Sequence, residues 1–338
     1  MTNGSKVEGR RSKATAGEVK ARARELGFAA CGITTPDPLP SRTADQLDRW
    51  LGSGMAGTMR YLHRQARRRK DPRLIVEGAK SIVVVLATYY NNEPPSALDP
   101  RPSTRTARFA RGLDYHAVVG ARLDRLAAWL LHRGAAVARP FLDAGPVPER
   151  ELARRAGLGW VGKNTMLLRP GLGSWTFIGT VFTDLELPPD SPFEADHCGS
   201  CTRCLQACPT GALPEPRVLD ATRCISYLTI EQKGPIPEEL VPALGGWGFG
   251  CDICNEVCPW NLKFAQPTPF PELLPRPGTD LSGLPVDHFA RLTDAEFAER
   301  HGRTAFARPG REGMDRNLKA ARRSVGASSR RPHRPGPA

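Results

Sequence analysis

The chain has 338 residues, with 48 Lys and Arg against 35 Asp and Glu, and a net charge of +13. This length provides for two domains, or for one large domain with an insertion, and for a sizeable core. The longest apolar run, residues 81–90, is about half of what a membrane-spanning helix needs, which excludes a transmembrane protein. The positive charge favours a polyanionic partner, although coding bias toward Arg produces the same excess.

The N-terminal segment predicts no targeting signal. Residues 1–20 lack the apolar run of a secretory signal peptide. The pair Arg10 and Arg11 is followed by polar residues, whereas a twin-arginine signal needs a hydrophobic stretch. We therefore expect a cytoplasmic protein with a disordered segment at residues 1–15. In that compartment, closely spaced cysteines are more often metal ligands than disulfides.

Helices and strands alternate through the first half of the chain. In chain order, hydrophobic periodicity predicts a helix at 16–27, strands at 29–34 and 81–90, a helix at 114–134, a strand at 135–143, a helix at 148–157 and a strand at 174–187. This pattern predicts an α/β (α+β) fold in which helices cover a sheet. No G-x-G-x-x-G follows a strand and no P-loop is present, so a nucleotide site is not supported.

The region after residue 190 is dominated by cysteine. The stretch CGSCTRCLQACPTGAL, residues 198–213, holds four of the nine cysteines of the chain. Its spacing, C-x2-C-x2-C-x3-C-P, is that of bacterial ferredoxins, in which three thiolates bind one 4Fe-4S cluster and the fourth binds a second cluster. Further along the chain, TRCISYL contributes a single cysteine and GCDICNEVCPW contributes three more.

The spacing divides eight of these cysteines into two groups of four. By the crossing typical of ferredoxins, the first group is Cys198, Cys201, Cys204 and Cys258, and the second group is Cys208, Cys224, Cys251 and Cys254. Because the distant Cys224 replaces a nearby ligand, we expect a ferredoxin-like module with an altered second half. Zinc held by the C-x2-C pairs is the alternative, but it does not explain two C-x3-C-P runs. The ninth cysteine, Cys31, lies in an apolar strand and is expected to be an inert core residue.

Two further stretches contain candidate site residues. Asp143 ends an apolar strand before a Gly-Pro turn, where a carboxyl can point into a pocket and have its pKa raised by burial. The alternative is that Asp143 caps the turn or the helix that begins near Pro148. In GLGWVGKN, closely spaced glycines let the backbone approach a large flat ligand near Trp160 and Lys163, or else form a tight turn around a core Trp.

Together these motifs resemble the epoxyqueuosine reductase family. The resemblance covers residues 15–265 and is carried by ARFARGLDYHAVV, FLDAGPVPERELARRAGLGWVGKNTMLL, GSWTFIGTVFTDLELP, RCISYLTIE and the two cysteine runs. It implies a nitroreductase-like cobalamin-binding domain at 16–190 and a ferredoxin-like module with two 4Fe-4S clusters at 191–265. After the module we expect a helical segment at 266–322 and, because the last residues are basic and of low complexity, a disordered tail at 323–338. The implied reaction is the reduction of epoxyqueuosine to queuosine at the wobble position of tRNA.

The resemblance also implies the chemistry of the site. Removing the epoxide oxygen as water requires two electrons and two protons, and a corrin gathers single electrons from clusters into such a pair. A general acid must protonate the departing oxygen, and Asp143 matches the family's proton donor in a DxxPxxER motif. An electron donor such as a flavodoxin or ferredoxin system would supply the clusters, and a monomer is sufficient.

The remaining roles follow from the same resemblance. Lys233 falls where the family contacts tRNA, and the basic segments RQARRRKDPR and ARPGREGMDRNLKAARR can follow a phosphate backbone, although a charge run is usually a solvated face. The end of the chain departs from the family, which commonly continues into helical repeats. The residues implied to surround the cobalamin, with no cobalt-ligating role for the histidine, are Tyr115, His116, Trp160, Lys163, Ser226, Gly250, Asp252 and Ile253.

Two other functions fit part of the pattern. Reductive dehalogenases resemble the same corrinoid and two-cluster arrangement, but they usually carry an export signal and have no need of a strongly positive surface. A non-catalytic electron carrier would use the clusters alone and leaves no reason for a corrin. The bound cofactor therefore discriminates the carrier from the reductases, and the substrate discriminates the two reductases.

Overall fold

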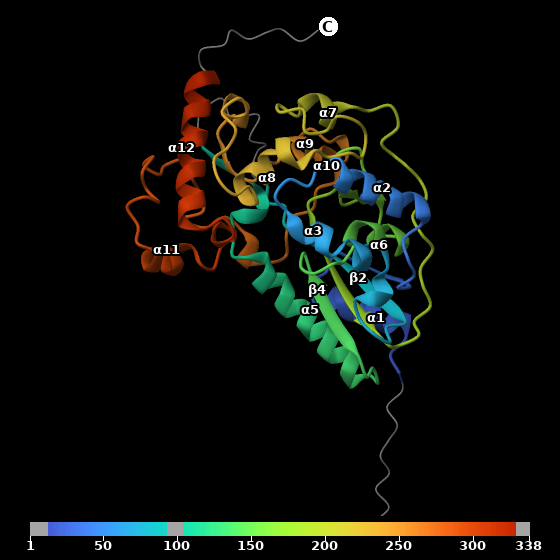
Figure 1. Cartoon of the computed structure of the whole chain (residues 1–338). Helices are drawn as coiled ribbons and strands as arrows, with labels where there is room; N and C mark the ends of the chain where they lie inside the picture. Colours follow the sequence, from blue (N-terminus) through green and yellow to red (C-terminus); the bar gives the residue numbers. More distant parts are fainter. Residues whose placement is uncertain (1–12, 93–103, 329–338) are drawn as a thin grey trace, which may run out of the picture.

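The computed structural model describes residues 13–92 and 104–328. Figure 1 shows a sheet with its covering helices, the cysteine-rich module next to it, and the C-terminal helices α11 (Asp294–His301) and α12 (Gly310–Ser328) on the left. Of the segments predicted to be disordered, residues 1–12 and 329–338 lie outside the described residues.

The central sheet has four antiparallel strands in the order β1-β2-β7-β4. In that order they comprise Ala30–Thr34, Ser81–Thr88, Thr176–Thr183 and Ala138–Leu142. All eight residues of β2 are buried, because this strand lies inside the sheet with helices on both faces.

Side chains of β2 alternate between the two faces of the sheet, as the two-residue period of a strand requires. One set, beginning at Val83, packs with helices α1 (Ala16–Glu25) and α5 (Tyr115–His132). The other set, beginning at Ile82, packs with α6 (Glu149–Arg155). The sheet covered by helices is therefore confirmed, and each helix and strand predicted before residue 190 is present with shifted ends.

Three helices between β1 and β2 are absent from the sequence prediction. They are α2 (Ser41–Gly52), α3 (Arg60–Arg64) and α4 (Ala66–Lys70). Their starts have no side-chain cap, and Leu51 is the one fully buried residue among them. Helix α2 has apolar residues at three- and four-residue steps from Ala44 to Leu51, a signal that the sequence prediction missed, whereas α3 and α4 are short and basic and carry little signal.

Short helices that begin at or next to cysteines build the module. They are α7 (Arg203–Ala207), α8 (Ile225–Ile230), α9 (Ile253–Glu256) and α10 (Pro259–Phe264). Cys224 and Cys258 are the N-cap residues of α8 and α10, so a candidate metal ligand and a helix start coincide.

Small elements connect these parts. The strands are β3 (Arg105–Thr106), which pairs in parallel with β8 (Trp247–Phe249), and the hairpin of β5 (Trp160–Val161) and β6 (Leu167–Leu168). The 3-10 helices are η1 (Pro72–Leu74), η3 (Arg108–Ala110), η4 (Ala221–Arg223), η5 (Val241–Leu244), η6 (Pro271–Leu273) and η7 (Ala305–Ala307). Because β3 precedes α5 and β8 precedes the second cysteine run, their pairing joins the module to the sheet domain.

Helix α12 extends beyond its predicted end. The sequence places a disordered tail from residue 323, whereas the helix continues to Ser328. Leu318 and Ala321 are buried on one side of it, and Arg323 pairs with Glu238. The helix therefore passes the residue at which the tail was predicted to begin. None of the described helices is long and apolar enough to cross a membrane.

Candidate active site and cysteine groups

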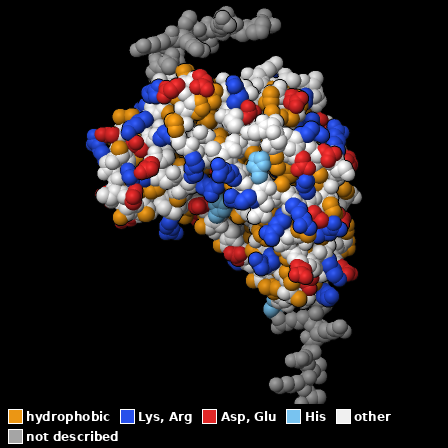
Figure 2. Space-filling view, viewed as in Figure 1, with side chains coloured by type: hydrophobic (Ala, Val, Ile, Leu, Met, Phe, Trp, Pro, Cys, Tyr) orange, Lys and Arg blue, Asp and Glu red, His pale blue; other side chains and the backbone are white. Residues whose placement is uncertain are grey.

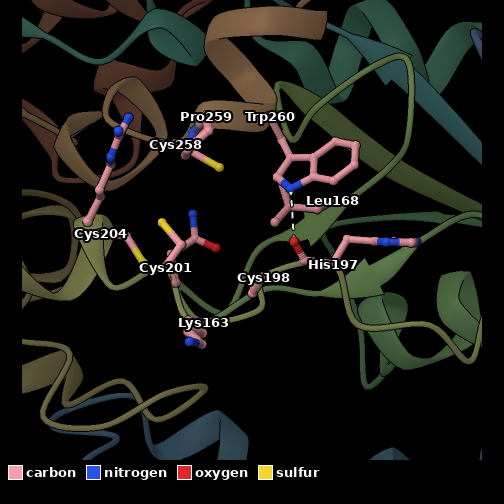
Figure 3. Close-up of a pocket in the computed structure, with 11 residues that line it drawn as sticks. Lys163, Leu168, His197, Cys198, Cys201, Cys204, Cys258, Pro259 and Trp260 are labelled. Atoms are coloured by element: carbon pink, nitrogen blue, oxygen red, sulfur yellow. Dashed lines mark hydrogen bonds between the residues drawn. The ribbon is translucent and has the colours of Figure 1, made fainter.

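The first cysteine group surrounds a cavity of about 210 Å³. Its lining includes Cys198, Cys201, Cys204 and Cys258. Figure 3 shows that Cys201, Cys204 and Cys258 direct their sulfur atoms toward this shared space. Cys258 comes from the second cysteine run, so the crossing predicted from the spacing is present in the structure.

This cavity suits a cluster better than a single ion. Zinc–sulfur bonds are about 2.3 Å long, so four cysteines on one zinc would close the space between them. Four free cysteines around an open volume are what a 4Fe-4S cluster requires, and the zinc alternative does not fit.

Trp160 and Lys163 lie at the first cysteine group. The Trp160 Nε1 is 3.4 Å from Cys198 Sγ, and Lys163 donates from Nζ to the Gly199 carbonyl at 2.6 Å. Gly159, directly before β5, lets the backbone pass close to β6, since a Cβ there would lie 2.0 Å from the Leu168 carbonyl oxygen. Both residues therefore contact the first cysteine group, and their expected place beside a corrin stays a prediction.

The second cysteine group lies deeper in the fold. Burial raises the pKa of the Cys224, Cys251 and Cys254 thiols, and neighbouring thiols of the group raise it further. Both Cys208 and Cys204 act on Cys254 in this way. Because Cys204 belongs to the first group, the two groups lie next to each other.

A buried ionic network ties the second group to the sheet domain. The Asp252 carboxylate accepts a hydrogen bond of 2.7 Å from the Arg108 backbone N–H, and burial raises the pKa of Asp252 to about 6. The Arg108 guanidinium lies 3.8 Å from Glu256 and over the rings of Tyr90 and Trp175. Since the Asp252 side chain points to Arg108, the backbone of Asp252 is the part available to a cofactor.

Aromatic contacts lead from the second group to Asp143. Gly250 precedes Cys251 with φ +65°, and a Cβ on it would lie 3.1 Å from the Phe109 ring. The Phe109 ring centroid is 6.1 Å from that of Tyr115. The Tyr115 hydroxyl in turn donates a hydrogen bond to Asp143 Oδ2, so two residues predicted for the site are in direct contact.

Asp143 directly follows β4 in a left-handed backbone conformation, φ +46°, which is uncommon outside glycine. Its N–H donates to Glu149 Oε1 at 2.8 Å. The Arg69 guanidinium donates to the carbonyl oxygens of Gly145 and Val147 at 3.0 and 3.1 Å. These hydrogen bonds hold the loop that carries Asp143 against α4 and α6.

The expected burial of Asp143 is wrong. The residue is exposed, because β4 is an edge strand and its loop lies at the border of the sheet. The neighbouring Glu149 is half-buried, and its pKa is raised to about 8 by burial and by Asp143. The capping alternative also fails, since the N-cap of α6 is Pro148 and no side chain bonds there. Sequence reasoning missed Glu149, although it stands in the ER pair of the motif that contains Asp143.

The other residues predicted to face a cofactor lie near the second group or near Asp143. His116 Nδ1 lies 2.8 Å from Asp114, a hydrogen bond that raises the pKa of His116. Ser226, in α8, hydrogen-bonds the Cys224 thiol. Ile253 is partly buried against the same core as Cys224.

The two basic segments differ in their surroundings. Around α12 the arginines are engaged within the protein, since Arg308 pairs with Glu231 and Arg316 donates to backbone carbonyls. Lys233 is exposed after α8. Figure 2 shows Lys and Arg side chains gathered near the middle of the face that carries α3. Within the described chain, no carboxylate pairs with the following arginines of α3 and α4: Arg60, Arg64, Arg67 and Arg68.

Comparison with known proteins identifies the family. A protein of Gloeobacter violaceus named epoxyqueuosine reductase is 38% identical over 323 residues, which cover 94% of this chain and 99% of the relative. The chain belongs to the epoxyqueuosine reductase family. Residues 69–144 match the family described as epoxyqueuosine reductase QueG, DUF1730, and residues 197–261 match the 4Fe-4S double cluster binding domain.

Solved epoxyqueuosine reductases share this fold. One crystal structure, in complex with an epoxyqueuosine-modified stem loop of tyrosine tRNA, has a TM-score of 0.79 and 30% identity, covering 93% of this chain and 82% of that chain. A Bacillus subtilis epoxyqueuosine reductase, described with its catalytic aspartate loop swung out of the active site, has a TM-score of 0.79 and 31% identity over the same shares. The predicted family and the mixed α/β fold are confirmed.

Proposed function

We propose that this chain reduces epoxyqueuosine to queuosine at the wobble position of tRNA. The observation that carries the proposal is the extent of the similarity, which spans nearly the whole Gloeobacter epoxyqueuosine reductase. The similarity includes both the sheet domain and the double-cluster module. A solved relative with the same fold is bound to a tRNA stem loop that carries the epoxide substrate.

Two 4Fe-4S clusters are proposed to occupy the two cysteine groups. The first group encloses a cavity of about 210 Å³, and the second gathers four thiols around Cys254. Clusters of this kind pass electrons singly. Because Cys204 lies near Cys254, the two groups form one route through the module.

Cobalamin fits the surface between the second cysteine group and Asp143. Met59, Phe109 and Ile253 are partly buried against the core that also contacts Cys224 and Cys251, so they present an apolar surface that a flat ring can cover. When bound, cobalamin converts single electrons into a two-electron reductant. The residues proposed to contact it are Tyr115, His116, Ser226, Gly250, Ile253 and the backbone of Asp252.

Asp143 is proposed to protonate the departing oxygen. The hydrogen bond from the Tyr115 hydroxyl orients the carboxyl, and the hydrogen bond from its own N–H to Glu149 holds the loop in place. Its exposure at the end of β4 leaves the carboxyl accessible to a large substrate. A positioned general acid typically contributes 10²–10⁴-fold to a rate.

The tRNA is proposed to lie across α3 and α4 and the loop that contains Lys233. The unpaired arginines of these helices suit phosphate contacts, whereas the arginines around α12 are engaged within the protein. The modified base would enter from an unpaired anticodon loop, where bases can be splayed out. A flavodoxin or ferredoxin electron donor, a monomeric state and a cytoplasmic location stay predictions.

The test is an anaerobic conversion assay on protein produced with cobalamin. We expect bound corrin, about eight irons per chain for two clusters, and mass-spectrometric detection of queuosine after reductant and epoxyqueuosine-containing tRNA are added. Conversion should disappear in Asp143→Ala. Bound corrin without conversion rejects the substrate, and iron without corrin leaves the electron-carrier alternative.

A further inference from the structure

The outer side of the first cysteine group is apolar and exposed. Leu262, in α10, is 61% exposed, the largest value among the exposed large hydrophobic side chains of the described chain. Trp260, on the same helix, forms part of the cavity wall and stacks on Phe264 with ring centroids 5.3 Å apart. His197 lies 5.6 Å from Trp260, ring to ring. Because α10 begins at Cys258, a protein that covers these side chains reaches the wall of the first cavity.

Positive charge lies at the cavity and next to Leu262 in the chain. Arg203 lines the cavity, and Arg203 and Lys263 are both exposed and pair with no carboxylate within the described residues. The acidic residues nearby in the chain are compensated, since Asp196 pairs with Arg217 and Glu194 with an arginine of α6. We call His197, Arg203, Trp260, Leu262 and Lys263 the outer face.

The placement of the two cysteine groups gives the route a direction. The second group continues through Gly250, Phe109 and Tyr115 to Asp143, and Asp252 between its cysteines is 2% exposed. The first group is the one that borders the outer face. A protein that docks on the outer face therefore meets the first group before the second, and this follows from the position of the outer face because thiols of both groups are partly exposed.

We propose that the outer face is the docking surface of a small acidic protein that carries single electrons. The proposal rests on the proposed function, which requires an external reductant. An apolar centre within a charged rim is the usual composition of a protein interface, and positive charge steers an acidic partner toward it. Each encounter oxidises the carrier by one electron and reduces this chain by one. Two encounters and two protons release one epoxide oxygen as water.

The experiment uses the cluster-loaded protein with the double change Leu262→Glu and Lys263→Glu. Reduction of the clusters is followed anaerobically by stopped-flow absorbance, with reduced flavodoxin in one arm, reduced ferredoxin in a second and dithionite in a third. We expect the rate constant for an acidic carrier to fall about tenfold or more and its dependence on salt to flatten. Iron content and the rate with dithionite should not change.

A matched control lies at the other end of the molecule. Leu131 is 46% exposed near the end of α5, and the exposed Arg139 lines the same surface hollow. Figure 1 shows this end of α5 far from α10. The double change Leu131→Glu and Arg139→Glu removes the same types of side chain, and it should leave both carrier-driven rates at the wild-type value.

Three outcomes decide the proposal. Unchanged rates in both carrier arms overturn it, and so does weaker binding of a tRNA stem loop with unchanged reduction, because the outer face would then be an RNA surface. If the double variant loads less iron, the single change Lys263→Gln is measured instead. A ratio of carrier-driven to dithionite-driven rates below that of the wild type supports the proposal, and an unchanged ratio overturns it. Conversion of tRNA by the wild type with dithionite tests the proposed function separately: conversion without a docking effect rejects only the surface, and a docking effect without conversion rejects only the function.

Discussion

The two cysteine groups use the same ligand type in opposite surroundings. The first group borders solvent, with Arg203 on its cavity and the exposed Leu262 close by. In the second group burial raises the pKa of three of the four thiols, and the neighbouring Asp252 is hydrogen-bonded to the buried Arg108. One group is therefore placed to receive electrons from outside, and the other to deliver them near Asp143.

Three positions in two similar stretches account for much of this difference. When CTRCLQACP and CDICNEVCP are aligned on their cysteines, Thr202 corresponds to Asp252 and Gln206 to Glu256. These two acids give the second run its contacts with Arg108. The second of the two positions between the first two cysteines also changes, from the charged Arg203 to the apolar Ile253. A charged side chain suits contact with solvent, and an apolar side chain suits contact with a flat cofactor. The same ligand spacing thus serves two roles through the residues between the ligands.

Removal of one ligand from each group should give the largest effects. We expect Cys254→Ser and Cys201→Ser each to lose about half of the iron, one of two clusters. Cys254→Ser should abolish conversion with every reductant. Cys201→Ser should abolish conversion with protein carriers but keep residual conversion with dithionite. Iron analysis and the conversion assay measure both, and Cys31→Ser should retain all of the iron. Identical losses with dithionite in the two variants would contradict the distinction between the groups.

Asp143→Asn should give the next largest effect, at the inner end of the route. The substitution keeps a side chain that can accept from the Tyr115 hydroxyl but removes the acid, so conversion should fall about 10²–10⁴-fold. Iron content, corrin content and the rate of cluster reduction should stay at wild-type values, because the substitution touches neither cysteine group. Asp37→Asn, on an exposed carboxyl, is the control. Wild-type conversion by Asp143→Asn would exclude this residue as the proton donor.

Arg108→Met should separate the stabilities of the two groups. The variant removes the guanidinium that lies 3.8 Å from the buried Glu256 carboxylate and keeps the backbone N–H that binds Asp252. Breaking a buried ion pair typically costs about 3–5 kcal/mol. We expect a lower thermal midpoint, and we expect the EPR signal of the cluster in the second cysteine group to be lost first. Glu256→Gln in the same chain should restore part of the stability by removing one buried charge. Equal loss of both clusters would show that Arg108 supports the whole module instead.

Much of the fold was readable because its signals are local. The apolar run of β2 and the periodic α5 predict their elements directly, since one is buried on both faces and the other packs one face on the sheet. Cysteine spacing likewise predicts the grouping of ligands, because loops of two or three residues leave few ways to surround a cluster. Helices α3 and α4 carry no such signal and escaped prediction, whereas the apolar stripe of α2 was present and was overlooked.

The surroundings of the site were not readable because they depend on distant contacts. Asp252 meets Arg108 across 144 positions of the chain, and no periodicity reports such a contact. The burial of Asp143 was predicted from the strand before it, but β4 turned out to be an edge strand, which exposes Asp143, while the neighbouring Glu149 is half-buried. Position within the sheet, and not the local sequence, decides how far each carboxyl is buried.

The smallest expected effect concerns His301, which packs behind β8, the strand before the second cysteine run. This side chain is 3% exposed, and both ring nitrogens lack a hydrogen-bond partner within the described residues. Its ring lies 5.8 Å from Phe306, which contacts Phe249 in the strand that leads to Cys251. Burial lowers the pKa of His301 below 6.5, and the nearby His288 lowers it further.

As pH falls through about 6.5, the unfolded chain binds a proton at this histidine that the folded chain does not, so stability should decrease. His301→Leu removes the unsatisfied nitrogens and this proton, and it should raise the thermal midpoint by about 2–4 °C at pH 7, for a gain of about 1 kcal/mol, with a larger difference at pH 5. The measurement is the thermal midpoint of the loaded protein from pH 5 to 8, with His63→Leu on the exposed side of α3 as the control. Parallel curves of thermal midpoint against pH for wild type and His301→Leu would show that keeping this histidine neutral costs the folded protein no stability. A divergence accompanied by earlier loss of the cluster in the second cysteine group would show that the packing behind β8, and not the ligands themselves, sets the acid stability of that group.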